Sequence, residues 1–234
     1  MIKRLLDILI SLVGLTIISP IFLLFIFLIF LYDFKSPFYV APRVGKNAKL
    51  FKMVKLRSMK INADKSGVAS TANDDDRITP IGKLIRKLKF DEISQLINVF
   101  FGSMSLVGPR PQVEKDVKLY TEKEKNLLIV RPGITDFSSI VFSDEGNILK
   151  GSNDPDRDYN NLIRPWKSRL GLFYIKHQNI LIDIMLILFT IISFFNKKWV
   201  LIKISNYLRK KNASEDIIKL VLRVNPLRPE LPPE

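Results

Sequence analysis

Two adjacent carboxylates and one arginine are the residues whose types and order could do chemistry. Asp91 and Glu92 follow a stretch rich in Lys and Arg, and Arg110 lies between two prolines further along. A carboxylate can attack phosphorus when cations neutralise the phosphate and the leaving group is good. Arginine can clamp that phosphate through two parallel N–H donors. An Asp-Glu pair alone is most often solvated or simple helix-start chemistry, so the inference depends on the surrounding segment.

The composition limits the partners and excludes several chemistries. Lys and Arg number 37 against 23 Asp and Glu, so the formal charge is +14. This excess favours an anionic partner, which could be nucleic acid, anionic lipid or a phosphorylated substrate. The chain has no cysteine, which excludes disulfides, thiolate catalysis and Cys-based zinc sites. Its single histidine, His177, makes a His-based metal cluster or a Ser-His-Asp triad a poor explanation.

A long apolar segment lies near the N-terminus. Ile8 to Tyr32 gives 25 uncharged positions, enough to cross a bilayer as a helix. A plain transmembrane helix is one interpretation; a signal peptide is not, because the run is too long and lacks a small-residue cleavage site. Ser19 and Pro20 predict a bend within it, and both flanks are positive, as cytoplasmic flanks are. We therefore expect a re-entrant helix that bends at Ser19-Pro20 and returns to the face it entered.

The remaining pattern predicts mostly helices. Alternating apolar and basic positions at 38–60 indicate strand-like or irregular structure. Thr79-Pro80 is a good helix start, and residues 79–89 have a basic and an apolar face, which suits either the membrane interface or an ordinary surface helix. A second helix is expected over Asp91–Phe101, ended by Gly102.

Further segments carry simpler expectations. Residues 61–76, which include the acidic run at 73–76, and residues 143–161 are expected to be polar surface loops, and 131–135 a tight turn. A charged, solvated helix is predicted over Asp116–Asn126. Ile180–Phe195 is expected to be a buried or interfacial helix, since it is short for a membrane span and holds Asp183. The proline-rich end is expected to be extended.

These stretches together resemble the bacterial sugar transferase family, the monotopic polyprenyl-phosphate phosphoglycosyl transferases. The matching stretches are KRLLD with the apolar run and its SP pair, APRVGKNAKLFKMVKLRSM, DDDRITPIGKLIRKLKFDEISQLINVFFGSMSLVGPRP, and VRPGIT. The similarity is close from residue 1 to about residue 135 and looser to about residue 195. The occurrence of all four stretches in this order makes the resemblance specific.

The resemblance implies a reaction and roles. Such enzymes move a sugar-1-phosphate from a UDP-sugar to polyprenyl phosphate with Mg²⁺. Asp91 matches the nucleophile, which forms a phosphosugar-aspartyl intermediate and releases UMP, and Mg²⁺ is held at or beside it. Glu92 matches the second acid of the dyad. The other matched positions are the phosphate-binding Arg110, the basic Lys55, Thr135 and Asp183 as further substrate- or phosphate-binding candidates, and Ser19 and Pro20 at the membrane-helix break.

Two departures fall where the sugar could be recognised. Many members continue after PGIT with a Gly-x-Ala-Gln-Val-Asn-Gly-Arg type of sequence, whereas this chain reads DFSSIVFSDEGNILKG. Gly171 stands where an acid often precedes the aromatic pair Phe173-Tyr174. The identity of the sugar is therefore not carried over.

The expected protein is α+β and mostly helical, monotopic, with a re-entrant helix and interfacial amphipathic helices. Its expected divisions are the membrane helix at 1–36, the catalytic domain at 37–195 and a basic, proline-rich C-terminal extension at 196–234. The resemblance places it on the cytoplasmic face of the bacterial inner membrane, with UDP-sugar, polyprenyl phosphate and membrane lipid as partners, and allows a homodimer. The alternative is a non-enzymatic basic scaffold that binds anionic lipid. Nucleic acid is not expected as a partner, because it would explain the charge but not the apolar run.

Overall fold

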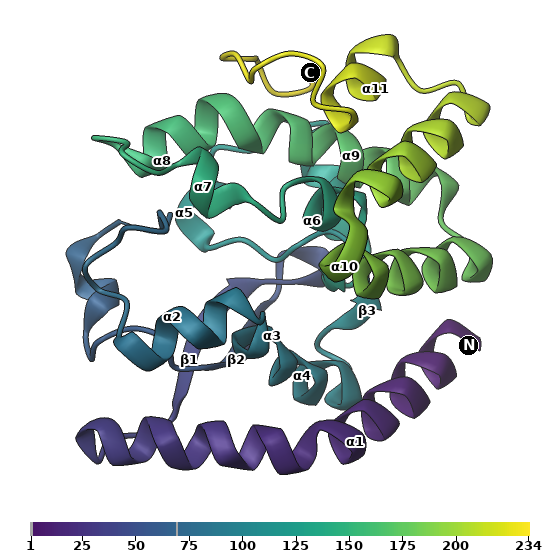
Figure 1. Cartoon of the computed structure of the whole chain (residues 1–234). Coiled ribbons are helices and arrows are strands. Elements are labelled where there is room, and N and C mark those ends of the chain that lie inside the picture. Colours follow the sequence, from purple (N-terminus) through teal and green to yellow (C-terminus); the bar gives the residue numbers. More distant parts are fainter. Residues whose placement is uncertain (1, 69) are drawn as a thin grey trace.

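A long apolar helix, α1 (Ile2–Asp33), runs along one edge of the molecule in the computed structural model, which describes residues 2–68 and 70–234 (Figure 1). The helix is continuous through Ser19 and Pro20 and bends along its length. Beside the proline, Ser19 Oγ donates to the carbonyl of Thr16 at 2.8 Å, a local bond that Ser commonly makes within a bent helix. Most apolar side chains of α1 are exposed.

Both ends of α1 are tied to the body of the protein. Near its start, Lys3 Nζ lies 2.5 Å from Asp183 Oδ2, and Asp7 accepts a hydrogen bond from the backbone N–H of Leu106 at 3.0 Å. At its end, Asp33 receives two hydrogen bonds from the Arg57 guanidinium at 2.5 and 2.6 Å. These contacts hold the two ends of one helix against the same body.

The chain then forms an antiparallel hairpin of β1 (Phe38–Val44) and β2 (Leu50–Leu56), which confirms the strand-like interpretation of this region. A short 3₁₀ turn, η1 (Lys46–Ala48), connects the strands, and η2 (Ala63–Ser66) follows them. Lys55 lies near the end of β2, paired with Tyr39. The hairpin packs against α3 and α4 and so supports the segment that carries the carboxylate pair.

Three short helices follow: α2 (Pro80–Lys87), α3 (Phe90–Ile93) and α4 (Gln95–Phe101). The predicted start of α2 is confirmed, since Thr79 Oγ1 accepts the N–H of Gly82 at 2.9 Å. The single helix predicted from Asp91 to Phe101 is instead divided at Ser94. This residue is buried, and its hydroxyl donates to the carbonyl of Val54 at 3.1 Å. The hydrogen bond fixes the chain to the β-hairpin at this residue.

Two three-residue strands, β3 (Ser105–Val107) and β4 (Gly133–Thr135), pair in parallel within the body of the protein. Their backbones approach closely: a Cβ added at Gly133 would lie 2.1 Å from the nitrogen of Gly108. Glycine is the residue that permits this approach.

The segment between these strands corrects one prediction. In place of a solvated helix over Asp116–Asn126, the chain forms α5 (Glu114–Val117) and the 3₁₀ helix η3 (Glu124–Ile129). Glu124 is fully buried and accepts a hydrogen bond from Ser168 Oγ at 2.6 Å. It also accepts the N–H of Thr121 at 3.0 Å, so the acid caps a new turn rather than continuing a helix.

The predicted loop at 143–161 is also wrong in part. After α6 (Phe137–Val141), it contains α7 (Glu145–Ile148), α8 (Pro155–Asp158) and the start of the π-helical η4 (Tyr159–Ile163), which continues into α9 (Arg164–His177). Asp154 caps α8 by accepting the N–H of Arg157 at 3.0 Å. The polar residues that suggested a loop therefore start helices or line a cavity instead.

The last elements are α10 (Ile180–Lys210), which kinks at Asn196, and α11 (Glu215–Val221). By length and composition, α1 and α10 are both long and apolar enough to cross a membrane. The half of α10 after the kink packs on α11 and α6 (Figure 1). The residues that this half and α11 add to the main hydrophobic core are Val200, Leu201, Ile204, Leu208, Ile217, Ile218, Leu220 and Val221.

Candidate active site

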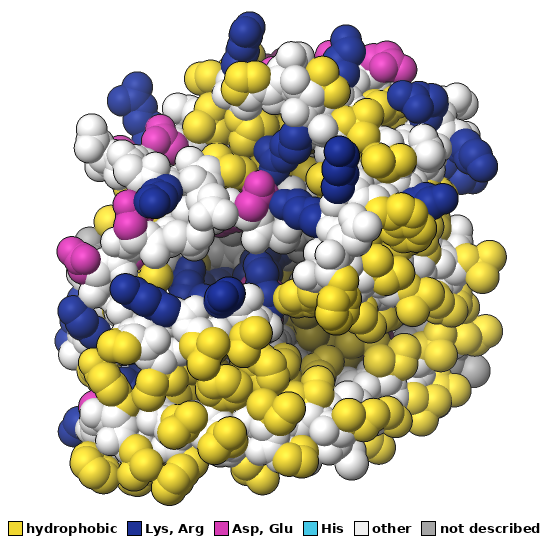
Figure 2. Space-filling view, in the orientation of Figure 1, with side chains coloured by type: hydrophobic (Ala, Val, Ile, Leu, Met, Phe, Trp, Pro, Cys, Tyr) yellow, Lys and Arg dark blue, Asp and Glu magenta, His cyan; other side chains and the backbone are white. Residues whose placement is uncertain are grey.

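A cavity of about 570 Å³ lies between the α2–α3 segment with β2 on one side and the segment from α6 to η4 on the other. Figure 2 shows a hollow at the middle of this face, with Lys and Arg side chains at its rim and a broad apolar surface below it over α1. The cationic residues that line the cavity are Arg43, Lys55, Lys83, Arg86, Lys87, Lys89, Arg110 and Lys167.

The turn between α2 and α3 aims the carboxylate pair at this cavity. Lys89 adopts a left-handed conformation, with φ of 59°, which ends α2 and starts α3 in a new direction. The first residue of α3, Phe90, packs on Phe25 of α1, with ring centroids 5.0 Å apart. Asp91 and Glu92 follow in the first turn, and both line the cavity.

Glu92 and Arg110 form a close ion pair. Arg110 Nη2 donates to Glu92 Oε1 at 2.5 Å, and both side chains are mostly buried. Burial alone would raise the pKa of Glu92, but the charges of Arg110 and Lys55 outweigh it and hold that pKa well below its usual range. Glu92 therefore stays ionised and keeps the guanidinium of Arg110 at the cavity.

Asp91 has the opposite environment. It is buried, and burial raises the pKa of its carboxyl, although the charge of Lys55 opposes the shift. In the described part of the chain Asp91 makes no ion pair, so its carboxylate remains available to a substrate. A desolvated, unpaired carboxylate beside cations suits nucleophilic attack on an electrophile that brings its own negative charge.

Lys55 extends toward the dyad from β2. It is half-buried, and burial together with the charge of Arg110 lowers its pKa to about 8. The charges of Asp91 and Glu92 partly offset this shift. The structure thus brings together four of the predicted residues: Asp91, Glu92, Lys55 and Arg110 all line one cavity.

Two further candidates lie elsewhere in the molecule. Thr135 is buried, and its Oγ1 lies 2.6 Å from Thr190 Oγ1. Asp183 accepts a hydrogen bond from Tyr174 OH at 2.6 Å and pairs with Lys3, so its carboxylate joins α10 to α1. Neither residue lines the cavity, and their predicted substrate roles stay predictions. Ser19 and Pro20 lie within α1, in the apolar edge.

The opposite wall of the cavity was missed by sequence reasoning. Lys167 pairs there with Glu145, and Gln112 Nε2 donates to Tyr159 OH at 2.9 Å. Asp144 lies beside Glu145 in the stretch that departs from the family pattern, and it lines the cavity too. The departure itself was the available signal, since it marked this stretch as the variable part of a site.

A divalent cation fits this site only in combination with a substrate. Among residues 2–68 and 70–234, no group of three or more His, Cys, Asp or Glu side chains could hold a metal ion. Within the described ranges the Asp91 carboxylate makes no ion pair, whereas the Glu92 carboxylate is paired with Arg110. Mg²⁺ is commonly bound by one or two carboxylates together with substrate phosphates, and the donor set fits that arrangement.

Comparison with known proteins agrees with the motifs. The chain is 40% identical over 148 residues to the exopolysaccharide production protein ExoY of Sinorhizobium fredii, covering 57% of this chain and 66% of the relative. It is 35% identical over 207 residues to the exopolysaccharide production protein PSS of Rhizobium leguminosarum, covering 82% and 94%. It is 32% identical over 197 residues to the UDP-N-acetylgalactosamine-undecaprenyl-phosphate N-acetylgalactosaminephosphotransferase of Aeromonas hydrophila, covering 81% of this chain but 43% of that relative.

The family match is broader than any single motif. Residues 1–197 match the bacterial sugar transferase family, a range that includes α1, the hairpin, the carboxylate pair, Arg110 and the first half of α10. The motifs, the cavity and the relatives point the same way, and the chain belongs to the bacterial sugar transferase family.

Proposed function

We propose that the protein transfers a sugar-1-phosphate from a UDP-sugar to polyprenyl phosphate and releases UMP, as the first membrane step of surface glycan synthesis. The observation that carries this proposal is the buried Asp91, which makes no ion pair with any described residue, in a cation-lined cavity next to an arginine that Glu92 holds in place. The cavity can accept a diphosphate, and the apolar surface of α1 lies nearby for a lipid acceptor (Figure 2).

The first half of the reaction uses Asp91 as the nucleophile. A carboxylate oxygen of Asp91 attacks the phosphorus nearest the sugar, and an O–P bond forms as the P–O bond to UMP breaks. UMP leaves with the electron pair of that bond. Arg110 and Lys55 stabilise the charge on the phosphate oxygens as it redistributes, which is the main task of a protein in phosphoryl transfer.

The second half returns the enzyme to its starting state. An oxygen of polyprenyl phosphate attacks the same phosphorus, the O–P bond to Asp91 breaks, and the carboxylate is free again. The product is the sugar on a polyprenyl diphosphate. Mg²⁺, held by Asp91 and the substrate phosphates, would supply additional charge neutralisation when bound.

Monotopic attachment to the cytoplasmic face of the inner membrane is part of the proposal. A helix of 32 residues is about 48 Å long at ~1.5 Å per residue, longer than the ~30 Å hydrocarbon core. If α1 crossed the bilayer, its ends would lie on opposite sides. Lys3 and Asp33, near the two ends, both bind the same body, which favours a helix that enters and leaves on one side.

A basic, non-enzymatic membrane scaffold is the second candidate function. The surface charge and the apolar edge favour it equally well. The scaffold hypothesis gives no reason for a buried acid, Asp91, that no described residue pairs with, or for Glu92 and Arg110 buried at a cavity, because a lipid-binding surface needs exposed cations. The site therefore favours an enzyme.

Release of UMP tests the proposal directly. Purified protein in lipid nanodiscs is incubated with a panel of UDP-sugars, polyprenyl phosphate and Mg²⁺, and UMP is measured. Asp91→Asn should reduce turnover to background, and Arg110→Ala should reduce it by on the order of a hundredfold. Asp76→Asn, at an exposed acid outside the cavity, should match the wild type.

The covalent step has its own readout. Without acceptor, the intact mass of the wild-type protein should rise by one sugar phosphate, and that of Asp91→Asn should not. Full turnover by Asp91→Asn would refute its role as nucleophile. Lipid binding without turnover on any UDP-sugar would favour the scaffold.

A further inference from the structure

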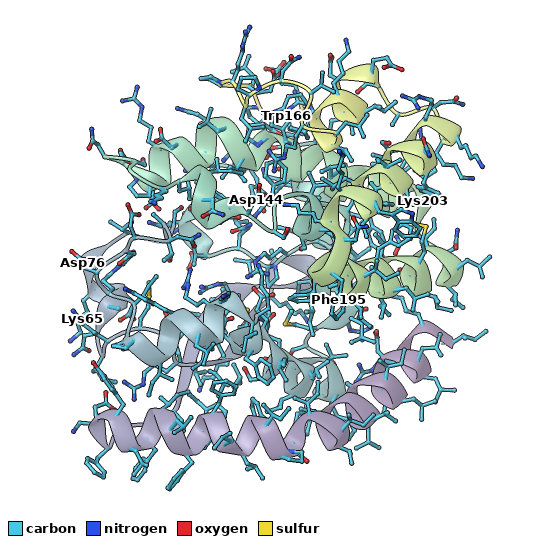
Figure 3. The ribbon with its side chains drawn as sticks, viewed as in Figure 1. Lys65, Asp76, Asp144, Trp166, Phe195 and Lys203 are labelled. Carbon is cyan, nitrogen blue, oxygen red and sulfur yellow. The ribbon has the colours of Figure 1, made fainter. Side chains whose placement is uncertain are left out.

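The C-terminal part of the chain, residues 196–234, holds one wall of the cavity, and all of it after Lys197 lies beyond the family match. Asp144, on that wall, receives two cations from this part of the chain: Lys197 Nζ lies 2.9 Å and Arg223 Nη2 3.2 Å from its Oδ1. Lys197 follows the kink of α10, and Arg223 follows α11. Figure 3 labels Asp144 above α2, on the segment that faces the hollow.

Arg223 makes three contacts to this wall. Besides Asp144, its Nη2 donates to the carbonyl of Val141 at 3.0 Å, and its guanidinium lies 4.7 Å from the ring centroid of Phe142. Val141 is the last residue of α6, and Phe142 and Asp144 lie in the turn between α6 and α7. Phe142, Asp144 and the next residue, Glu145, line the cavity.

The backbone at Arg223 indicates that its side chain has a task. Arg223 has φ of 54°, and the chain ends α11 with the N–H of Arg223 bonded to Leu220 and that of Val224 bonded to Lys219. This is the Schellman motif, in which glycine is the favoured residue at the left-handed position. An arginine there costs conformational energy that its contacts with the wall can offset.

The tail after α11 fastens the neighbouring wall. The N–H of Glu230 donates to the carbonyl of Asn161 in η4 at 3.0 Å, and Arg169 of α9 pairs with the Glu230 carboxylate at 3.1 Å. These elements carry Tyr159 and Lys167, which line the cavity. Residues after 196 therefore contact both the turn between α6 and α7 and the η4–α9 segment that carries Tyr159 and Lys167.

We propose that residues 196–234 act as a brace that fixes the wall at residues 142–147 and thereby sets the affinity for the nucleotide sugar, with Lys197 and Arg223 as positioning residues. This rests on the proposed function. The wall lies across the cavity from the reacting Asp91, so it can contact parts of the donor that do not react. A looser wall would weaken donor binding while leaving Asp91, Lys55 and Arg110 in place.

Two measurements on full-length protein test the brace. The first is steady-state kinetics with the UDP-sugar that gives most UMP. Arg223→Ala should raise KM for that UDP-sugar about tenfold with kcat within about twofold, since the lost contacts support binding rather than chemistry. KM for polyprenyl phosphate should not change, and Arg223→Lys, which can keep the ion pair, should restore most of the affinity. The second is amide hydrogen exchange of residues 141–150, which should be faster in Arg223→Ala.

Lys219→Ala is the matched control, because it removes an exposed cation from the same end of α11. The brace is overturned if Arg223→Ala equals Lys219→Ala in both measurements. It is also overturned if kcat falls along with a loss of thermal stability while KM is unchanged, because the segment would then only support the fold. A wild-type protein with no turnover would refute the proposed function instead, and hydrogen exchange would still decide whether Arg223 holds the wall.

Discussion

At the scale of single residues, the adjacent acids Asp91 and Glu92 lie in different electrostatic surroundings. Burial raises the pKa of Asp91, which makes no ion pair among the residues that the structure describes, whereas the Arg110 guanidinium beside Glu92 overcomes burial and keeps the pKa of that acid low. Pairs of acids whose pKa values are pushed apart commonly divide roles at an active site. Because the pKa of Glu92 is held low, its carboxylate stays paired with the guanidinium of Arg110.

Lys55 allows a test of the cation cluster through pH. Burial and the charge of Arg110 lower its pKa to about 8, so Lys55 is protonated below that pH and neutral above it. Since only the protonated form stabilises phosphate charge, kcat/KM for the UDP-sugar should fall as pH rises through about 8. Lys55→Arg keeps its proton at high pH, and its kcat/KM should show no such fall. The measurement is UMP release from pH 6 to about 10.

Lys83→Arg is the control for that experiment, because Lys83 also lines the cavity but is exposed. Its profile should match that of the wild type. A fall near the same pH in Lys55→Arg would mean that another group controls the alkaline limb.

At the scale of elements, the sequence correctly predicted helix starts and ends that depend only on neighbouring residues. The cap at Thr79 and the stop at Gly102 are formed within a few residues, and both are confirmed. The predictions for Asp116–Asn126 and for 143–161 failed because their acids have distant partners: Glu124 bonds to Ser168, and Glu145 pairs with Lys167. Neither the order of neighbouring residues nor the composition of a segment indicates which distant residues that segment will contact.

The same distinction between local and distant contacts applies to the candidate site. Asp91, Glu92, Lys55 and Arg110 could be predicted to act together because motif resemblance supplied their grouping, which spacing alone could not. The division of α3 from α4 and the individual residues of the opposite wall could not be predicted, although the departure from the family pattern marked the stretch that carries Asp144 and Glu145. Both depend on side chains that meet only after the hairpin and the C-terminal helices have packed.

Gly82 links the position of α2 to that of the dyad, and it can be tested by substitution. A Cβ at this position would lie 1.9 Å from the carbonyl oxygen of Ser58, which is backbone and already accepts the N–H of Thr79. Gly82→Ala should therefore force α2 outward and destabilise the protein by about 1–3 kcal/mol. Thermal unfolding in nanodiscs would measure the loss.

Gly14→Ala in α1 serves as the comparison. Its added Cβ would meet only the end of the Leu96 side chain, at 3.3 Å, so the protein should retain nearly all of its stability. Equal stability of the two variants would show that α2 can shift freely, and the contact with Ser58 would then not position the dyad.

At the scale of the whole molecule, the apolar surface belongs to more than one element. Beyond α1, the first half of α10 also exposes apolar side chains, and they recur every three or four residues along one face of the helix. These residues are Leu181, Ile184, Leu188, Ile191 and Phe195. Figure 2 shows hydrophobic side chains along the lower edge and the right of this face. Large exposed apolar patches mark membrane or protein contacts. The basic rim of the cavity then lies just above a surface suited to lipid.

The absence of cysteine from the chain makes its topology directly testable. Single cysteines at exposed positions can replace Ile2 and Lys35 at the two ends of α1, Ile17 within it, and Asp76 on the body. If α1 enters and leaves on one side, a membrane-impermeant maleimide should label Ile2→Cys, Lys35→Cys and Asp76→Cys in inverted membrane vesicles but not in spheroplasts. Ile17→Cys should be protected in both, because lipid surrounds it. Labelling of Lys35→Cys in spheroplasts while Ile2→Cys remains protected there would mean that α1 spans the bilayer, and the contacts of Lys3 with Asp183 and of Asp7 with Leu106 could not then form in the membrane.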